Sequence, residues 1–381
     1  MKKKIRSLLA VMLVLWMPWS VSAETGEIPV TLTAASAILI EPVSGKVLLE
    51  QNADEALPPA SVTKIMSLLL VMEAIDSGKL REEDMISCSE TAAAMGGSQI
   101  WLKPGEEMSV HDLLKATAVV SANDATVLLA ETVAGSEEGF VAQMNERAQQ
   151  LGMEHTHFAN ATGLDAENHY SCARDIAVMA AELLRHDKIR EYTTIWMDTL
   201  REGKSELVNT NKLVRFYPGC TGLKTGTTAK AGYCLCASAQ REGLSLIAVV
   251  MDAPSSKERF ADAQKLLNYG YANYRVTRVE NPPESTGMAA VEKGVVSQVS
   301  FAPSAVFSAL LGRQKATEIV SEIHLEEPLQ APIREGDRVG QVEFLLDGEP
   351  IGSVDLVAGE SVERLTFSAA VRMIFSMLFS G

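Results

Sequence analysis

The sequence lacks the patterns that mark two common classes of protein. Its five cysteines and six histidines include no Cys-x-x-Cys pair and no His-Glu-x-x-His run, so their spacing predicts no metal site and no cofactor. Basic residues are also few, 34 against 49 acidic ones, which gives a net charge of −15 without a basic stripe or tail. This balance excludes nucleic acid as a partner.

Long apolar runs are absent too, and the apolar run near the N-terminus is short. Four basic residues within the first six positions precede it, it ends at Pro18, and Val21-Ser22-Ala23 fits a cleavage site. We expect residues 1–23 to be a signal peptide that is cleaved after Ala23, with a permanent membrane anchor as the alternative. The mature protein is then exported.

A second apolar segment stands at the C-terminus. Phe367, Val371, Ile374, Phe375 and Leu378 follow helical spacing and form one apolar stripe. Such a helix is about 20 Å long, whereas the core of a bilayer is about 30 Å thick. We expect residues 364–381 to be an amphipathic helix that lies on a membrane surface. A helix docked on the preceding domain is the alternative.

Between these ends, the order of strand-like and helical segments is typical of an α+β fold. An expected hairpin at residues 37–50 precedes a block of helices. Strand-like runs at 222–228, 233–238 and 244–251 follow this block and form an antiparallel meander, which a helix over 257–275 closes. The hairpin and the meander should share one sheet, so the sheet draws strands from both ends of the domain.

A proline-rich segment at residues 281–285 separates this domain from the rest of the chain. We expect a first domain at 24–279 and a small β-sandwich domain at 284–362. The second domain is predicted from strand-like runs at 294–302, 317–325, 338–346 and 350–357, which carry no catalytic pattern.

Ser61 and Lys64 stand at the start of the most apolar helix that the sequence predicts. Pro58 and Pro59 keep this helix from beginning earlier, and Lys64 follows Ser61 by one turn, so the amine and the hydroxyl share a face. Burial lowers the pKa of a lysine, and a neutral amine can act as the base for a hydroxyl. The same residues also fit a helix cap followed by a lysine that reaches solvent.

Two further patterns decide between these interpretations. Ser121-Ala122-Asn123 precedes a predicted helix, where Ser and Asn are also common caps, and Lys224-Thr225-Gly226 lies on an expected strand. In this order, the three patterns resemble those of the serine penicillin-recognising enzymes, and among them the D-alanyl-D-alanine carboxypeptidases, which are low-molecular-mass penicillin-binding proteins. The resemblance implies a β-lactamase/transpeptidase-like catalytic domain, then a small all-β domain and a C-terminal amphipathic helix.

The resemblance also implies the catalytic residues. Ser61 would be the nucleophile, Lys64 its base, and Ser121 the residue that passes the proton to the departing amine. The backbone N–H groups of Ser61 and Thr227 would form the oxyanion hole. No metal takes part in this chemistry.

Five further residues match positions that bind substrate in the family. Asn123 would hold the substrate amide, Lys224 would add positive potential, and Thr225 would bind the terminal carboxylate together with Arg259. Gly226 completes the pattern on the strand. The partners implied are peptidoglycan stem peptides that end in D-Ala-D-Ala, β-lactam antibiotics and the membrane surface.

The implied reaction is removal of the terminal D-Ala from stem pentapeptides through an ester on Ser61, at the outer face of the cytoplasmic membrane or in the cell wall space. A β-lactamase of the same fold is one alternative, although no Glu-x-x-Leu-Asn pattern appears near residues 155–160. A catalytically inactive, peptidoglycan-binding scaffold is another. The chain also departs from the family, which often has Thr where Cys172 stands and Asp where Thr221 stands.

Overall fold

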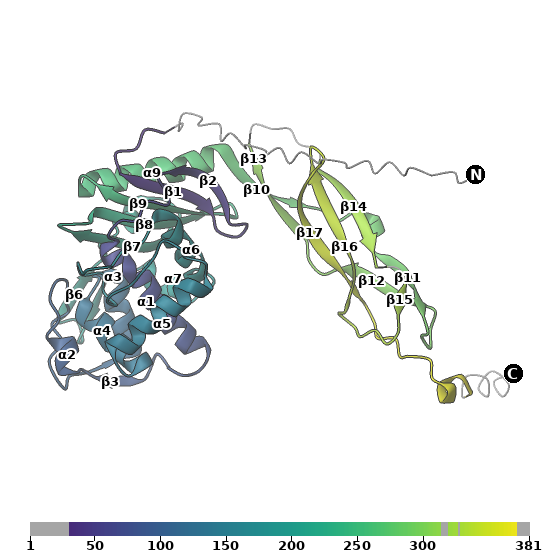
Figure 1. Ribbon diagram of the computed structural model, residues 1–381, viewed down its shortest axis with the longest axis horizontal. Helices are drawn as coiled ribbons and strands as arrows, with labels where there is room; N and C mark the ends of the chain where they lie inside the picture. The colour runs from purple at the N-terminus through teal and green to yellow at the C-terminus, as the bar shows by residue number, and fades with distance from the viewer. Residues whose placement is uncertain (1–29, 314–318, 327, 372–381) are drawn as a thin grey trace, which may run out of the picture.

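The computed structural model describes residues 30–313, 319–326 and 328–371. The predicted signal peptide and the end of the predicted C-terminal helix lie outside these ranges. A mixed unit of helices and strands comes first, and an all-β module lies beside it along the long axis of the molecule (Figure 1). The expected α+β fold is confirmed.

The first unit is built around an antiparallel sheet with the strand order β2-β1-β9-β8-β7. The predicted hairpin and meander supply its strands, which are β1 (Ser36–Glu41), β2 (Lys46–Gln51), β7 (Cys220–Thr228), β8 (Gly232–Arg241) and β9 (Leu244–Ala253). Because β1 pairs with β9, the two ends of the unit meet in one sheet, as expected. β7 lies at an edge of the sheet, and this places residues 224–227 beside the helical block.

Side chains alternate between the two faces of the sheet. On β8, Leu235 and Ala237 pack against the long helix α9 (Ser256–Asn273), whereas Cys234 and Cys236 face the helical block. Figure 1 shows α9 on one side of the sheet and α1, α4 and α5 on the other. The sheet is therefore buried on both faces, because helices cover each of them.

Helix α1 (Lys64–Asp76) runs through the middle of the helical block. It is apolar on nearly all sides, and Lys64 is buried in it together with residues from Ile65 to Met72. A 3-10 turn, η1 (Ala60–Thr63), leads into it. The helices around α1 are α3 (Val110–Val119), α4 (Asn123–Ala134), α5 (Glu137–Gln150), α6 (Ala173–Leu183) and α7 (Ile189–Thr193). Shorter elements at the rim are β3 (Met85–Ser87), α2 (Glu90–Ala93), β4 (Glu107–Ser109), β5 (Met197–Leu200), β6 (Ser205–Val208) and α8 (Leu213–Phe216).

The start of α4 differs from the alternative in which Ser121 or Asn123 caps the helix. The N-cap residue is Ala122, and no side chain makes the cap hydrogen bond. Asp124 instead accepts hydrogen bonds from the backbone N–H groups of Ile100 and Leu102, which fixes the loop that precedes β4. Asn123 and Asp124 therefore use their side chains for contacts outside the helix, whereas the Ser121 hydroxyl has no partner among the described residues.

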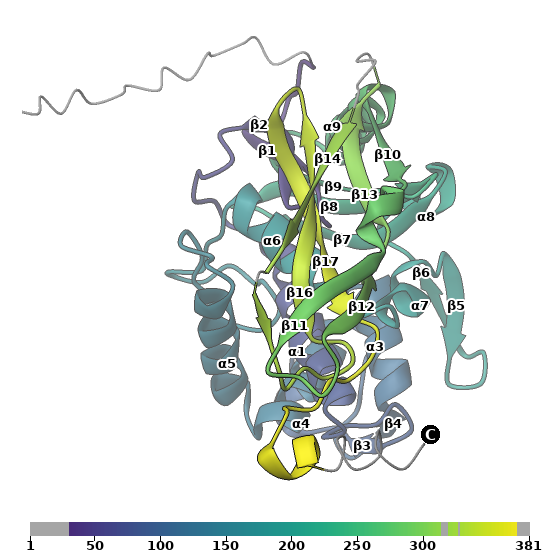
Figure 2. The ribbon, with the colours of Figure 1, turned by 90° about the vertical axis from the view of Figure 1, so that its right-hand side faces the viewer.

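The all-β module begins directly at the end of α9. This helix ends at Asn273 and not at Arg275, because β10 (Tyr274–Val279) continues from it and pairs with β13 (Phe307–Gly312). The main sheet of the module has the order β14-β16-β17-β12-β11-β15, and β14, β16 and β17 run side by side (Figure 2). Its elements are η2 (Pro283–Ser285), β11 (Gly287–Glu292), β12 (Gln298–Pro303), β14 (Ile319–Leu325), β15 (Leu329–Gln330), β16 (Arg338–Leu346) and β17 (Glu349–Ala358).

Arg313 connects the module to the end of α9. Its backbone N–H donates to the carbonyl of Asn273 at 2.7 Å, and its guanidinium donates to the carbonyls of Tyr271 and Tyr274, each at 3.0 Å. These contacts surround the point where the helix becomes a strand. The junction is therefore held by hydrogen bonds on both sides of this point.

The described part of the C-terminal segment begins as a helix at residues 367–371. Phe367 is 87% exposed there, so it does not pack on the all-β module. The rest of the predicted apolar stripe lies outside the described residues. Within the described ranges, no helix is both long and apolar enough to cross a bilayer.

Candidate active site

Ser61 lies on η1, where the chain passes between the sheet and α1. The edge strand β7 comes very close at this point. A Cβ atom on Gly226 would lie 2.8 Å from the carbonyl oxygen of Pro59 and 2.9 Å from the backbone nitrogen of Ser61, so a larger residue would force the two segments apart. Glycine is therefore required here, because it lets β7 approach η1 this closely.

Lys64 is fully buried one turn after Ser61, and three oxygen atoms surround its amine. Nζ lies 3.1 Å from Oγ of Ser61, 2.7 Å from Oδ1 of Asn123 and 2.6 Å from the carbonyl oxygen of Thr162. Burial, and secondarily the charge of Lys224, hold the pKa of Lys64 well below its usual range. The site therefore favours the neutral amine.

A neutral amine has two N–H groups and one lone pair, and its neighbours match this arrangement. The Asn123 oxygen and the Thr162 carbonyl only accept hydrogen bonds, so they take the two N–H groups. The lone pair is then left for the Ser61 hydroxyl, which can donate. This geometry allows Lys64 to remove the proton from Ser61.

The orientation of Asn123 is fixed from two sides. Its Nδ2 donates to the carbonyl of Gly96 at 2.7 Å, and its backbone N–H donates to the carbonyl of Ser98 at 2.7 Å. Since Nδ2 is bound to Gly96, Oδ1 must face Lys64. Asn123 therefore links the loop at residues 96–98 to the buried amine.

Ser121 has an uncommon backbone conformation and an unused hydroxyl. Its φ angle is +63°, and its buried Oγ has no hydrogen-bond partner among the described residues. Buried polar groups in folded proteins are nearly always paired, and backbone strain of this kind gathers at functional sites. Ser121 therefore has an unpaired hydroxyl for a bound molecule.

The segment at residues 160–163, which supplies the Thr162 carbonyl, is not predicted as part of the site from single residues. Asn160 Oδ1 accepts from the N–H groups of Thr162 and Gly163, and Ser67 of α1 donates to the carbonyl of Ala161 at 2.6 Å. Gly163 has a φ angle of +85°, and a Cβ atom there would overlap the Ala60 carbonyl at 1.9 Å. The segment is thus packed directly against η1.

His169 connects the same segment to the start of α1. Its Nδ1 accepts from the N–H of Ala159 at 3.0 Å, so the neutral ring carries its proton on Nε2 and donates to the Thr63 hydroxyl at 2.8 Å. Burial lowers the pKa of His169 to about 4. The ring is therefore neutral at physiological pH, and it holds the residue directly before Lys64.

Lys224 and Thr225 are buried on β7. Lys224 donates to the Thr225 carbonyl at 3.2 Å, and Thr225 donates to the Thr210 hydroxyl at 2.7 Å. Burial, and secondarily the charge of Arg259, lower the pKa of Lys224 to about 7. The charge of Lys224 in turn lowers the pKa of Lys64, so two positive charges are disfavoured in this space.

Arg259 reaches β7 from α9 and contacts the strand end. Its Nη1 donates to the Gly226 carbonyl and to Thr227 Oγ1, each at 2.9 Å, and its Nε has no partner among the described residues. Only about 7% of the residue is exposed. Arg259 therefore positions Thr227, and it adds positive charge next to it.

The structure brings the predicted residues into two groups. Ser61, Lys64 and Asn123 are joined by hydrogen bonds, and residues 224–227 lie with Arg259 along β7, which touches η1 at Gly226. A paired serine and buried lysine between a helix start and an edge strand define a class of serine enzymes that work by acyl transfer.

The chain belongs to the D-alanyl-D-alanine carboxypeptidase family, whose model matches residues 22–255. Residues 284–364 match a second model, the C-terminal domain of penicillin-binding protein 5. The catalytic domain and the all-β domain predicted from the sequence are therefore confirmed as a pair. The protein is a serine-type D-Ala-D-Ala carboxypeptidase, a hydrolase.

Relatives cover nearly the whole chain. The D-alanyl-D-alanine carboxypeptidase DacF of Bacillus subtilis is 41% identical over 374 residues, which are 96% of this chain and 96% of the relative. The crystal structure of penicillin-binding protein 5 from Haemophilus influenzae matches with a TM-score of 0.76 and 33% identity, over 89% of this chain and all of that one. Penicillin-binding protein D2 from Listeria monocytogenes, in its ampicillin-bound form, has a TM-score of 0.58 and 33% identity, over 64% of this chain and 99% of that one.

Proposed function

We propose that this carboxypeptidase removes the terminal D-Ala from peptidoglycan stem pentapeptides through an ester on Ser61. The contact between Ser61 Oγ and the buried amine of Lys64 carries the proposal. The two acceptors around Lys64 take its N–H groups and so direct its lone pair toward that hydroxyl. Among the residues the structure describes, Lys64 is the only group placed in this way. If Ser61 were only a helix cap, the lysine that follows it would not need to be buried.

In the first step, Lys64 takes the proton of Ser61, and Oγ attacks the carbonyl carbon between the two D-Ala residues. The carbonyl oxygen becomes an oxyanion, which the N–H groups of Ser61 and Thr227 stabilise. Each such donor contributes about 3–4 kcal/mol to the transition state. The close approach at Gly226 supports this pairing, since it brings η1 and β7 together.

In the second step, the C–N bond breaks, and the departing amine of D-Ala needs a proton. Ser121 passes this proton from Lys64 to the amine, a role that its unpaired buried hydroxyl supports. Water then attacks the ester and releases the shortened peptide, so that Ser61 regains its proton.

The remaining predicted residues bind the substrate. Asn123 holds the substrate amide, while Lys224 supplies positive potential that depends on its protonation. Thr225 and Arg259 bind the terminal carboxylate along β7, and Gly226 lets the peptide approach the strand. The carboxylate of the substrate would also offset the mutual repulsion of the buried cations.

Penicillins form the same ester on Ser61 and leave it slowly. Among the described residues, no carboxylate is hydrogen-bonded to Ser61, Lys64 or Ser121, which supports a carboxypeptidase over a β-lactamase that activates water with a glutamate. The three complete patterns likewise favour an enzyme over an inactive scaffold.

The protein works outside the cytoplasmic membrane, where its substrate lies. Residues 1–23 act as a cleaved signal peptide, residues 24–279 form the catalytic domain, and residues 284–362 form a spacer. Residues 364–381 form a helix that rests on the membrane surface. The exposed position of Phe367 supports this last role.

The test combines labelling with activity. Mass spectrometry of a digest after treatment with penicillin should find the adduct on the Ser61 peptide, and Ser61→Ala should abolish both the adduct and release of D-Ala from a pentapeptide. Ser77→Ala, at an exposed position after α1, is the matched control. An adduct elsewhere would contradict the proposal, and rapid loss of the penicilloyl group would indicate a β-lactamase.

A further inference from the structure

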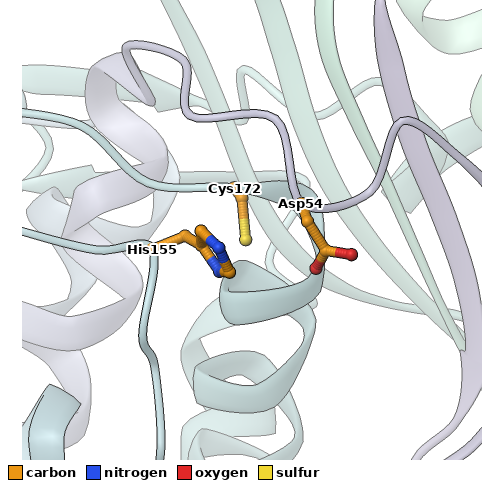
Figure 3. Close-up of side chains that lie close together, drawn as sticks. All are labelled: Asp54, His155 and Cys172. Atoms are coloured by element: carbon orange, nitrogen blue, oxygen red, sulfur yellow. The ribbon is translucent and has the colours of Figure 1, made fainter.

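A group of metal-binding side chains lies in the helical unit, outside the site described above. Asp54, His155 and Cys172 come from three separate segments, and one ligand atom of each lies within 4.8 Å of those of the other two. Figure 3 shows the Cys172 sulfur between the imidazole of His155 and the carboxylate of Asp54. Their spacing in the sequence predicts no such site, because the three residues meet only in the folded chain.

We propose that Asp54, His155 and Cys172 bind one zinc ion, with water as the fourth ligand. Zinc prefers a tetrahedral set of sulfur, imidazole nitrogen and carboxylate oxygen atoms. At the usual bond lengths, the ligand atoms of such a set are about 3.3–3.8 Å apart. Asp54 and His155 have exposed side chains, so rotation about their χ angles can close the remaining distance.

The backbones that carry the three ligands are already fixed to one another. The N–H of His155 donates to Asp175 Oδ2 at 2.8 Å, and Asp175 lies on the first turn of α6, which Cys172 caps. The N–H of Arg174 donates to the carbonyl of Ala53 at 3.0 Å, next to Asp54. The site therefore needs little ordering of the chain when the ion binds.

The charges around the site also favour a cation. An open hollow of about 380 Å³ adjoins Asp54, and its lining includes Glu50, Asp54 and Glu55 against the single cation Arg174. Arg174 donates to both oxygens of Asp54, to Oδ1 at 2.7 Å and to Oδ2 at 3.1 Å, and to Glu50 at 2.6 Å. Each Asp54 oxygen keeps a second lone pair, and the guanidinium holds the carboxylate in place as an outer partner of a ligand.

Binding must remove the proton of the Cys172 thiol. Burial raises the pKa of Cys172 to about 12, so the metal-free site holds the neutral thiol. Zinc binds the thiolate, and the proton goes to solvent, which makes the affinity rise with pH. The N–H of Asp175, which donates to the sulfur at 3.4 Å, remains to stabilise the thiolate.

The experiment uses the full chain, reduced and freed of metal with a chelator. Titration with Co²⁺ should produce a thiolate charge-transfer band in the near ultraviolet that saturates at one equivalent and disappears when Zn²⁺ is added. Cys172→Ser keeps a helix cap but should abolish the band, and His155→Gln should weaken binding at least about tenfold. Zn²⁺ should raise the melting temperature of the wild type and not that of Cys172→Ser.

Two control variants separate this site from other ligands in the chain. His324→Gln removes the histidine of the exposed group Glu322, His324 and Glu343 in the all-β module, and Cys220→Ser removes a half-buried thiol. Both should bind one zinc ion with unchanged affinity. Absence of the band, or equal zinc affinity of the wild type, Cys172→Ser and His155→Gln, would overturn the proposal. The readout is metal binding, so it does not depend on the proposed catalytic roles.

Discussion

Among the residues that the structure describes, no carboxylate is hydrogen-bonded to Lys64, and its amine is held by an amide oxygen, a backbone carbonyl and a hydroxyl. Burial keeps the pKa of Lys64 low, with a smaller effect from the charge of Lys224, and none of the three oxygen atoms carries a full negative charge to offset this. The state of this amine also distinguishes two possible roles of Lys64, a base and an electrostatic group. A base must lose its proton, whereas an electrostatic group must keep it.

Lys64→Arg distinguishes these roles, because arginine keeps the charge but cannot give up its proton. We expect the rate of acylation of Ser61 by penicillin to fall at least about 10²-fold, the lower end of what a general base contributes. The rate is measured by mass spectrometry of the adduct against time. Lys79→Arg, exposed after α1, is the control. A rate near that of the wild type would mean that Lys64 acts through its charge alone.

His169 makes the fold sensitive to acid. Its pKa is about 4 in the folded protein and about 6.5 in an unfolded chain, so the unfolded chain binds the extra proton first as the pH falls. Stability is therefore lost between pH 6.5 and pH 4, by about 3 kcal/mol for this shift. Denaturant unfolding at several pH values should show this loss for the wild type.

The matched variants for this prediction are His169→Gln and His324→Gln. His169→Gln removes the titration, so its free energy of unfolding should be lower at pH 7 but should fall less steeply from pH 6.5 to 4. His324 is half exposed, and His324→Gln should keep the steep slope. An equal slope for the wild type and His169→Gln would show that other groups cause the acid sensitivity.

At the scale of elements, the contact between η1 and β7 sets the geometry of the site. Gly226→Ala would place a methyl group 2.8–3.0 Å from atoms of residues 59–61, so β7 must move away. Because the N–H groups of Ser61 and Thr227 would then separate, we expect acylation to slow about 10²–10³-fold, as when one oxyanion donor is lost. Stopped-flow kinetics with a chromogenic substrate measure this.

Gly312→Ala on β13 is the control for this substitution, since its Cβ would meet nothing closer than 3.9 Å. It should acylate at the rate of the wild type. If Gly226→Ala acylates equally fast, the oxyanion is not held between these two segments.

The sequence predicts most of these elements because they are short apolar runs bounded by turn residues or apolar residues at helical spacing. The hairpin and the meander are such runs, the apolar residues of α9 follow period 3.6, and β16 occupies the expected residues 338–346. The strands of the module that were missed include β15, which has only two residues and pairs in parallel with the distant β11, and β11 itself, which also pairs with the following β12. Their formation depends on tertiary contacts that a local pattern does not contain.

The sequence predicts the parts of the site in which side chains carry the chemistry. It does not predict the parts in which backbone groups carry it. Ser61, Lys64, Ser121 and Lys224 stand out as residue types in order along the chain. The carbonyl of Thr162 has no signal in the sequence, since every residue has one. His169 could be found only from its contact with Thr63, and the zinc ligands only from the meeting of three segments.

At the scale of the whole molecule, the C-terminal segment is expected to carry membrane affinity and not stability. The N–H of Leu365 still donates to the carbonyl of Lys293, whereas Phe367 is exposed. A chain that ends at Leu365 should therefore fold and release D-Ala at the rate of the full chain, but it should not bind vesicles. Vesicle sedimentation and the D-Ala assay measure the two properties.

The lipid dependence gives a control for this prediction. Arg364 and Arg372 are the cationic residues near the apolar stripe, so binding should change little when anionic lipid is added. Misfolding of the shortened chain, or a full-length chain that does not sediment with vesicles, would mean that the segment serves the fold.

The hydrogen bonds of Arg313 at the end of α9 also determine how mechanical force passes through the molecule. A pull on the all-β module acts on β13 and β10, and from there along the axis of α9. This helix lies on the face of the sheet opposite α1, so the force reaches the sheet through that face. Since Arg259 of the same helix donates to the Gly226 carbonyl and to Thr227 Oγ1, a strain on α9 would pass through this guanidinium to the end of β7 that borders the site.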